Sequence, residues 1–331
     1  MQDTEHTWSL VLAAGDGRRL SDLCTDTAGR PVPKQFCTLG GGPSLLQLAM
    51  ARGRLLAPAD HVSVNVAAAH RRWWWRTLAD LPATNVIVQP DNRGTANGIL
   101  LQLLHVEQTD PAAEVVLLPS DHLVMDEYVL AAAVRRALRR VRGSPPKIVL
   151  LGMKPLAPDP ELGYILPAPP DRQGISEVIR FVEKPPVAAA TRLIKRGGLL
   201  NTFILVARCS TLLDVLTQAQ PALVRDMRAA MHPCRHRQTA LLELYEHLPT
   251  VDFSHEVLET VAPSALQVEA VGECGWSDLG TPERIGRAIS MLAQRGYPPI
   301  YAGIDSGEDV DLGARYLQSL LSAARNMRAS A

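Results

Sequence analysis

Apolar runs and helical patterns alternate through the first half of the chain, and this alternation constrains the fold more than any other feature. Short apolar runs separated by amphipathic stretches are typical of a mainly parallel sheet covered by helices on both faces. Strands are predicted at 10–14, 62–67, 86–88, 115–118 and 148–151. Helices are predicted between them at 45–56, 96–108 and 127–142, with Ser44 and Thr95 as N-caps of the first two.

The pattern changes at about residue 153, where several prolines break the chain into short extended pieces. This region is expected to be an inserted or appended substrate-binding part. Further strands are predicted at 175–183, 199–207 and 265–271, and further helices at 210–248 and 282–294. In the tail, 310–329, leucines recur at near-helical spacing, which predicts a helix that docks on its own domain or, alternatively, forms a dimer contact.

Composition narrows the class of protein. With 331 residues, 47% of them hydrophobic, the chain is long enough to bury a full core. The 34 basic and 34 acidic residues balance, which argues against nucleic acid or an acidic membrane as partner. Five cysteines without a C-x-x-C pair indicate a reducing compartment and no zinc site. The polar N-terminus and the short apolar run after it favour a cytoplasmic location.

The first predicted strand ends in a glycine-rich turn, AAGDGRRL, at residues 13–20. Its glycines let the backbone turn and approach a ligand without a Cβ in the way. Two arginines of the turn, together with Lys34 in the motif PKQF, add positive charge that suits a polyphosphate. A dinucleotide-binding turn would need a small residue where Leu20 stands, which counts against NAD. The turn therefore predicts a nucleoside triphosphate site, with a plain flexible loop as the simpler alternative.

Two aspartates follow predicted strands that lie far apart in the sequence. Asp121 stands in PSDH, and Asp278 stands in GWSDLG. Ligands of open α/β sheets bind at the carboxyl ends of the strands, and Mg²⁺ prefers one or two carboxylates together with phosphate oxygens. The two side chains are expected to converge on one Mg²⁺, although an aspartate that caps the next turn would look the same. Trp276, beside Asp278, is interpreted as a packing residue.

Two further segments carry polar groups suited to binding. Gln89 offers amide donors and a carbonyl acceptor for a nucleobase edge, and Gly94 and Thr95 start the following helix. Glu183 and Lys184 are expected on opposite faces if their strand stays regular, with Glu183 accepting from sugar hydroxyls and Lys184 holding a phosphate. A turn with an N-cap and a surface Glu-Lys pair are the simpler interpretations.

The order of these motifs resembles a known family. Along the chain they read LAAGDGRRL, PKQF, QPDNRGTA, LPSDH, LGY, FVEKP, LLNTF, VDFSHEVLE and GWSDLG. Together they resemble the sugar-1-phosphate nucleotidyltransferases, and within them the mannose-1-phosphate guanylyltransferases, over about residues 8–290. PKQF and PSDH look more like the guanylyl branch than the uridylyl or thymidylyl branches.

The resemblance implies a role for each matching residue. The glycine-rich turn would wrap the triphosphate, and the implied catalytic residues are Arg19, Lys34 and Lys184. The implied nucleotide-binding residues are Ala13, Ala14, Gly15, Asp16, Gly17, Arg18, Gln89, Gly94 and Thr95. The implied sugar-phosphate-binding residues are Gly163, Glu183, Lys184 and Asn201. The implied Mg²⁺ ligands are Asp121 and Asp278.

The resemblance also implies a fold and a reaction. The fold would be Rossmann-like, of the GT-A type, with a mixed, mainly parallel sheet, a substrate-binding insertion and a C-terminal helical tail. A catalytic domain would span 1–295, with the nucleotide half at about 1–152, the sugar-phosphate half at 153–280 and the tail at 296–331. GTP and mannose 1-phosphate would give GDP-mannose and pyrophosphate with Mg²⁺, and no phosphomannose isomerase activity is expected. Another sugar or base, or a non-catalytic nucleotide-sugar sensor, is the alternative.

The chain departs from the family pattern in three places. Arg18 replaces a threonine, the usual T-x-Y-G-Y-I reads PELGYI at 160–165, and the usual N-S-G reads Asn201-Thr202-Phe203. The last two concern the sugar pocket. A separate oddity is Trp73-Trp74-Trp75, because three consecutive residues of a helix cannot all face inward. These tryptophans and the tail are the candidate contacts of a homodimer, and the nine histidines are interpreted as structural or solvated.

Overall fold

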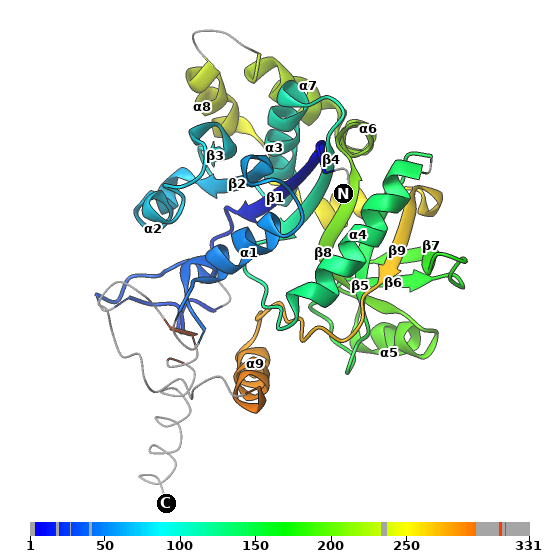
Figure 1. Cartoon of the computed structure of the whole chain (residues 1–331). Coiled ribbons are helices and arrows are strands. Elements are labelled where there is room, and N and C mark those ends of the chain that lie inside the picture. Colours follow the sequence, from blue (N-terminus) through cyan, green and yellow to red (C-terminus); the bar gives the residue numbers. More distant parts are fainter. Residues whose placement is uncertain are drawn as a thin grey trace, which may run out of the picture.

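The computed structural model describes residues 4–17, 20–26, 28–39, 42–143, 145–232, 237–295, 311, 312 and 315. Arg18 and Arg19 lie outside the described residues, as does most of the predicted tail helix. Within the described ranges the chain forms a mixed α/β fold, as the sequence predicts, with one sheet of nine strands between layers of helices (Figure 1).

The sheet has the order β3-β2-β1-β4-β8-β5-β9-β7-β6. Its strands are β1 (Thr7–Ala13), β2 (Val62–Ala67), β3 (Val86–Gln89), β4 (Glu114–Pro119), β5 (Ile148–Met153), β6 (Tyr164–Pro167), β7 (Ile175–Val182), β8 (Leu199–Arg208) and β9 (Leu266–Ala270). The first four strands are parallel to one another, whereas β8 runs antiparallel to both of its neighbours, β4 and β5. The sheet therefore changes from parallel to mixed pairing at β8.

Helices cover both faces of the sheet. They are α1 (Leu45–Arg54), α2 (Arg71–Thr77), α3 (Thr95–Thr109), α4 (Glu127–Gly143), α5 (Val187–Lys195), α6 (Cys209–Ala219), α7 (Pro221–Ala230), α8 (Arg237–His247) and α9 (Pro282–Gln294). Successive residues of a strand point to opposite faces, so Leu10 lies in the core cluster that includes residues of α3 and α6, while Val11 lies in the cluster that includes residues of α1 and α4. Figure 1 shows α1 and α4 on one side of the sheet and α3 and α6 on the other.

Most predicted elements agree with the structure to within a few residues, because their periodicity is a local property. Ser44 caps α1 through a full capping box with Gln47. Thr95 was expected to be an N-cap and is instead the first residue of α3, with Gly94 as the cap. The broad helical range 210–248 contains three helices, and β6 and α5 were not predicted. The short β6 lies in the proline-rich region, where its pairing with β7 and β8 compensates for a weak local pattern.

The three tryptophans lie on α2 with different environments. Trp74 is buried and donates from Nε1 to the Ala67 carbonyl at 2.9 Å, whereas Trp75 is 51% exposed. Trp73 stacks on Phe36, with ring centroids 6.0 Å apart. As the helical geometry requires, one side chain faces inward and one faces outward.

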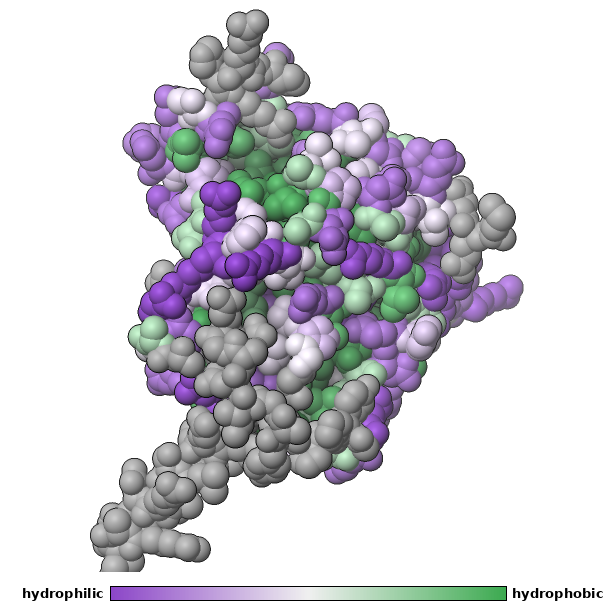
Figure 2. Space-filling view, turned by 60° about the vertical axis from the view of Figure 1, so that its left-hand side comes forward, coloured by the Kyte–Doolittle hydropathy of each residue, from purple (hydrophilic) through white to green (hydrophobic). Residues whose placement is uncertain are grey.

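The outer surface is mostly hydrophilic on the face in Figure 2, with apolar residues visible in patches between charged and polar ones. In the described part of the chain, no helix is both long enough and apolar enough to span a bilayer.

Candidate active site

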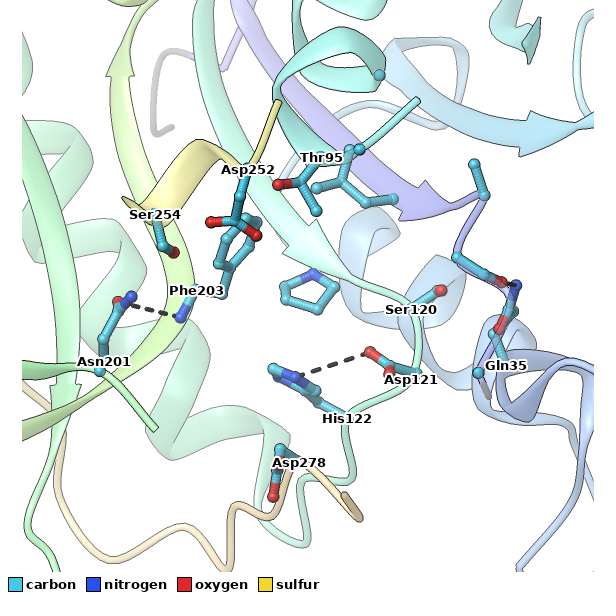
Figure 3. A pocket seen from close by; sticks show the side chains of 18 of the residues that line it. Gln35, Thr95, Ser120, Asp121, His122, Asn201, Phe203, Asp252, Ser254 and Asp278 are labelled. Carbon is cyan, nitrogen blue, oxygen red and sulfur yellow. Dashed lines mark hydrogen bonds and ion pairs between the residues drawn. The ribbon is translucent and has the colours of Figure 1, made fainter. Parts of the chain in front are cut away.

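A cavity of about 410 Å³ lies beside the carboxyl ends of β1, β3 and β4, close to the point where the pairing of the sheet changes. Ligands of open α/β sheets bind at such a position. Figure 3 shows Ser120, Asp121 and His122 on the loop that follows β4, with Asn201 and Phe203 of β8 on the other side. The predicted site residues that line the cavity are Ala14, Gly15, Gly17, Gln89, Gly94, Thr95, Asp121, Gly163, Glu183, Lys184, Asn201 and Asp278.

The glycine-rich turn is held against the start of the PKQF motif. Gly17 has φ +64°, and a Cβ there would lie 2.8 Å from the Lys34 backbone nitrogen, so only glycine fits without strain. Gln35 donates from Nε2 to the carbonyls of Ala13 (2.9 Å) and Gly15 (2.8 Å). Ala13 itself is buried in β1 and does not line the cavity, and Asp16 points to His70 instead, with Oδ1 3.5 Å from Nε2.

Lys34 connects the loop after β4 to the segment that carries Asp278. Its side chain is buried, and Nζ lies 2.8 Å from Asp121 Oδ2 and donates to the Asp278 carbonyl at 2.6 Å. Both aspartates therefore contact one ammonium group, although they are 157 positions apart in the sequence. The structure thus brings Asp121 and Asp278 to one lysine, which pairs with the carboxylate of Asp121 and with the main-chain carbonyl of Asp278.

His122 lies among these charges. Burial lowers the pKa of His122 from its ordinary value of 6.5 to about 4, although Asp121 and Asp278 oppose the shift. The ring is therefore neutral at pH 7, and Trp276 donates from Nε1 to His122 Nδ1 at 3.3 Å. Burial would raise the pKa of Asp121, but the Lys34 ammonium and His122 lower it to about 2, so this carboxylate stays charged.

Asp278 is fixed by an arginine from α9. Arg284 pairs with Asp278 Oδ2 at 2.6 Å and also with Asp159, and both Arg284 and Asp278 are buried. Gly280 makes room for this pair, because a Cβ there would lie 2.5 Å from Asp278 Oδ2. The other oxygen, Oδ1, is buried and has no hydrogen-bond partner among the described residues. A buried carboxylate oxygen without a partner is available to a ligand or a cation.

The amide of Gln89 is already engaged on both sides. Nε2 donates to Asn65 Oδ1, and Oε1 accepts from the Tyr245 hydroxyl at 3.2 Å. Gly98 allows this arrangement, since a Cβ there would lie 2.7 Å from Gln89 Nε2. Each amide group keeps the capacity for one more hydrogen bond, so a contact to the base stays a prediction. Thr95 accepts at Oγ1 from the Phe253 N–H at 2.8 Å, which connects α3 to the segment before Ser254.

Glu183 and Lys184 do not lie on opposite faces, because β7 ends at Val182 and Lys184 has φ +44°. The two side chains form an ion pair instead, with Nζ 3.1 Å from Glu183 Oε1. Burial raises the pKa of Glu183, against the lowering effect of Lys184, and Oε2 is buried without a hydrogen-bond partner in the described ranges. Gly163 packs on this oxygen, where a Cβ would lie only 2.5 Å from Oε2.

Sequence reasoning missed several residues that contribute to the site. Gln35 and His122 belong to the motifs PKQF and PSDH, and Asp252 and Ser254 belong to VDFSHEVLE, so the motif strings contained a signal that the interpretation left unused. Ser254–Leu258 form a π-helix, a form that is frequent at functional sites. Trp276, interpreted as packing, also lines the cavity.

The fold and the cavity define the class, which is an α/β protein with a cavity at the carboxyl edge of its sheet, lined by a glycine-rich turn and by the carboxylates of Asp121 and Asp278. Residues 8–295 match the family described as Nucleotidyl transferase, and the chain belongs to this enzyme family.

The chain is also similar to individual curated proteins. The chain is 30% identical over 282 residues to "Xanthan biosynthesis protein XanB" of Xanthomonas campestris pv. campestris (strain B100), a match that covers 82% of this chain and 57% of that protein. It is 27% identical to "Mannose-1-phosphate guanylyltransferase" of Escherichia coli (strain K12), with 83% of this chain and 58% of that protein covered. The chain therefore spans little more than half the length of these curated relatives.

A solved structure is also similar. It is a crystal structure described as "mannose-1-phosphate geranyltransferase" from Thermus thermophilus, and it superimposes with a TM-score of 0.74 at 26% sequence identity. The similarity covers 86% of this chain and 79% of that one, so it extends over most of both proteins.

Proposed function

We propose that this protein transfers GMP from GTP to mannose 1-phosphate, forming GDP-mannose and pyrophosphate. The supporting observation is that one cavity is lined both by most of the residues expected to bind nucleotide and by all four expected to bind sugar phosphate. The names of the relatives from Escherichia coli and Thermus thermophilus support mannose 1-phosphate as the substrate.

In the proposed reaction, an oxygen of the sugar phosphate attacks the α-phosphorus of GTP. A new P–O bond forms there while the bond between the α-phosphorus and the bridging oxygen breaks, and pyrophosphate leaves with that oxygen. No covalent enzyme intermediate is required, so the protein acts by aligning the two phosphates and by stabilising charge.

Mg²⁺ is proposed as the cofactor, and the donor groups fit it. Asp278 Oδ1 is buried without a partner in the described ranges, and the Asp121 carboxylate stays ionised. Among the described residues, no group of three or more His, Cys, Asp or Glu side chains forms a metal site by itself. Two aspartates would therefore hold the ion together with substrate oxygens, as Mg²⁺ prefers. When bound, the ion would neutralise charge on the phosphate oxygens.

The chain's own groups have separate tasks in this proposal. The glycine turn presents backbone N–H groups to the triphosphate, and Lys34 keeps the two aspartates together. Glu183 and Asn201 would accept and donate hydrogen bonds to sugar hydroxyls, and Lys184 would hold the sugar phosphate. Arg18 and Arg19 are proposed to contact the triphosphate, as the family resemblance implies.

The test is pyrophosphate release from GTP with Mg²⁺ and a panel of hexose 1-phosphates, repeated with ATP, CTP, UTP and dTTP. We expect turnover with GTP and mannose 1-phosphate to exceed that with every other pair. Faster turnover with another pair would support the nucleotidyl transfer reaction but contradict the proposed pair of substrates. Absence of turnover with all pairs, in a protein that still binds GDP-mannose, would favour a non-catalytic nucleotide-sugar sensor.

A further inference from the structure

Phe203 combines three features that are seldom found together. It lines the sugar half of the cavity, it is only half-buried, and its backbone has φ +60°. Side chains with a Cβ rarely adopt this left-handed conformation, which glycine adopts freely. Among the described residues, only Lys184 and Leu279 share this feature without being glycine. Strain of this kind persists where the surrounding structure enforces it, and it clusters at ligand sites.

A bulge in β8 produces the unusual backbone. β8 pairs with β5 through Leu150–Leu205 and Gly152–Asn201, so two steps along β5 correspond to four steps along β8. The two additional residues lie around Phe203. A bulge bends its strand and redirects a side chain, and bulges are common beside active sites.

Side-chain hydrogen bonds hold the bulge in place. Thr202 is fully buried, donates from Oγ1 to the Leu151 carbonyl at 2.7 Å and accepts from the Ile204 N–H at 3.1 Å. Asn201 accepts at Oδ1 from the Phe203 N–H at 3.1 Å. The segment Asn201-Thr202-Phe203 therefore supplies the hydrogen bonds that keep Phe203 in its conformation.

The bulge places an aromatic ring among hydrogen-bonding groups. Figure 3 shows Phe203 with Asn201, Asp252 and Ser254, and all four residues line the cavity. The ring packs edge-to-face on Phe253, with centroids 6.1 Å apart and an interplanar angle of 69°, and Phe203 still lines the cavity. Glu183, whose Oε2 has no partner in the described ranges, lines the same half.

A pyranose is a ligand with matching chemistry. Its hydroxyls need carboxylate and amide partners, while its C–H groups form apolar faces that pack on an aromatic ring. We infer that Phe203 is a specificity-determining residue, whose ring packs on the hexose of the sugar 1-phosphate and excludes hexoses of another shape. This inference rests on the proposed function, since it concerns the sugar of that reaction.

Two variants distinguish the effect of removing the Phe203 ring from the effect of relieving its backbone strain. Phe203→Ala removes the ring and keeps a strained backbone, whereas Phe203→Gly removes both. We expect kcat/KM for the preferred hexose 1-phosphate to fall in both variants by about 10-fold, the lower part of the range for an apolar contact. The preference for that hexose over its epimers should shrink equally in both, with the KM for GTP unchanged. Phe203→Gly should melt at a higher temperature than Phe203→Ala.

A conservative variant completes the set. Phe203→Tyr keeps the ring and should retain the wild-type order of preference among hexose 1-phosphates. If the alanine and glycine variants keep that order, or if the KM for GTP rises as much as the KM for the sugar phosphate, Phe203 serves only packing and the inference is overturned.

Equilibrium binding measurements test the role of Phe203 separately from the proposed function. Calorimetry with mannose 1-phosphate and glucose 1-phosphate measures the sugar site without turnover. A wild-type protein that binds hexose 1-phosphates but forms no nucleotide sugar would overturn the proposed function, and the variants would still test Phe203 through affinity. A wild-type protein that binds no hexose 1-phosphate would overturn both.

Discussion

The two halves of the cavity use left-handed backbone differently. On the side proposed to bind nucleotide, Gly17 and Gly94 have positive φ, and at both positions an added Cβ would collide with backbone atoms of Lys34 or Val251. On the side proposed to bind the sugar phosphate, Lys184 and Phe203 have positive φ and carry large side chains into or beside the cavity. The glycines of the first side thus let two backbone segments pack closely, whereas the second side places particular side chains at the cavity.

This difference follows from what each half is proposed to bind. Phosphates are recognised well by backbone N–H groups, which every residue other than proline supplies, so this side can use glycines that pack closely on the Lys34 and Val251 backbones. Hexoses differ in the orientation of single hydroxyls, so their discrimination depends on side-chain chemistry and position. Strain is therefore tolerated on the sugar side, where a side chain is required at a backbone position that suits glycine.

The largest effect is expected where the two halves meet. In Asp278→Asn, the amide still accepts from Arg284, but the charge facing the cavity is lost, so kcat should fall on the order of 10² to 10³-fold. Pyrophosphate release measured across a Mg²⁺ titration checks this. The matched control is Asp159→Asn, which alters another acidic partner of Arg284 that does not line the cavity. Equal losses in both variants would show that Arg284 pairing, and not a cation site, is what matters.

The second largest effect is expected in the pH dependence of stability, which depends on His122 beside Asp121. In the folded protein the pKa of His122 is about 4, whereas in the unfolded chain it is about 6.5. Between these pH values the unfolded chain therefore binds a proton at His122 that the folded protein does not bind. Stability present above pH 6.5 should therefore be lost as the pH falls towards 4, by about 3 kcal/mol, from the difference of the two pKa values. Urea unfolding with a chelator present measures it.

His122→Gln should flatten this pH dependence, because glutamine does not titrate and its carbonyl can still accept from Trp276. A variant of the exposed His255, such as His255→Gln, should retain the loss. An equally steep loss in His122→Gln would assign the acid sensitivity to other groups.

The third largest effect is expected on the side proposed to bind nucleotide. Gly17→Ala places a Cβ 2.8 Å from the Lys34 nitrogen at φ +64°, so the free energy of unfolding should decrease by about 1–3 kcal/mol. Gly15→Ala, two residues earlier, meets no atom within 4 Å and should change stability by less than about 0.5 kcal/mol. Denaturant unfolding compares the two, and similar values would contradict the assignment of Gly17 as the constrained position.

The smallest effect is expected at Lys184. Lys184→Asn removes the ammonium, while asparagine accepts the left-handed backbone better than most residues. We expect the KM for the sugar phosphate to rise about 10-fold, the equivalent of about 1.4 kcal/mol, with little change in melting temperature. Steady-state kinetics at saturating GTP measures it. If Lys184→Asn instead loses affinity for GTP alone, the boundary between the two halves has been drawn in the wrong place.

Much of the fold could be predicted because its signals are local. The apolar runs of β2 and β5 and the cap of α1 by Ser44 depend on neighbouring residues only. The short β6 could not be predicted, since its pairing with β8 spans a long stretch of chain. The order of motifs was sufficient to place the chain in its family. Lys34 contacts both predicted aspartates, through the carboxylate of Asp121 and the main-chain carbonyl of Asp278, while their joint binding of Mg²⁺ stays a prediction.

What the sequence alone determined is the family, the α/β fold and several of the residues that line the cavity, because motif order, residue types and strand periodicity can be read along the chain. Only the tertiary structure decided how those residues are used. The bond from Lys34 to the Asp278 carbonyl spans 244 positions, and the neutral state of His122 depends on burial among distant elements. The left-handed backbone at Phe203 arises from pairing between β8 and β5. Such properties depend on contacts between remote segments, and no local pattern encodes them.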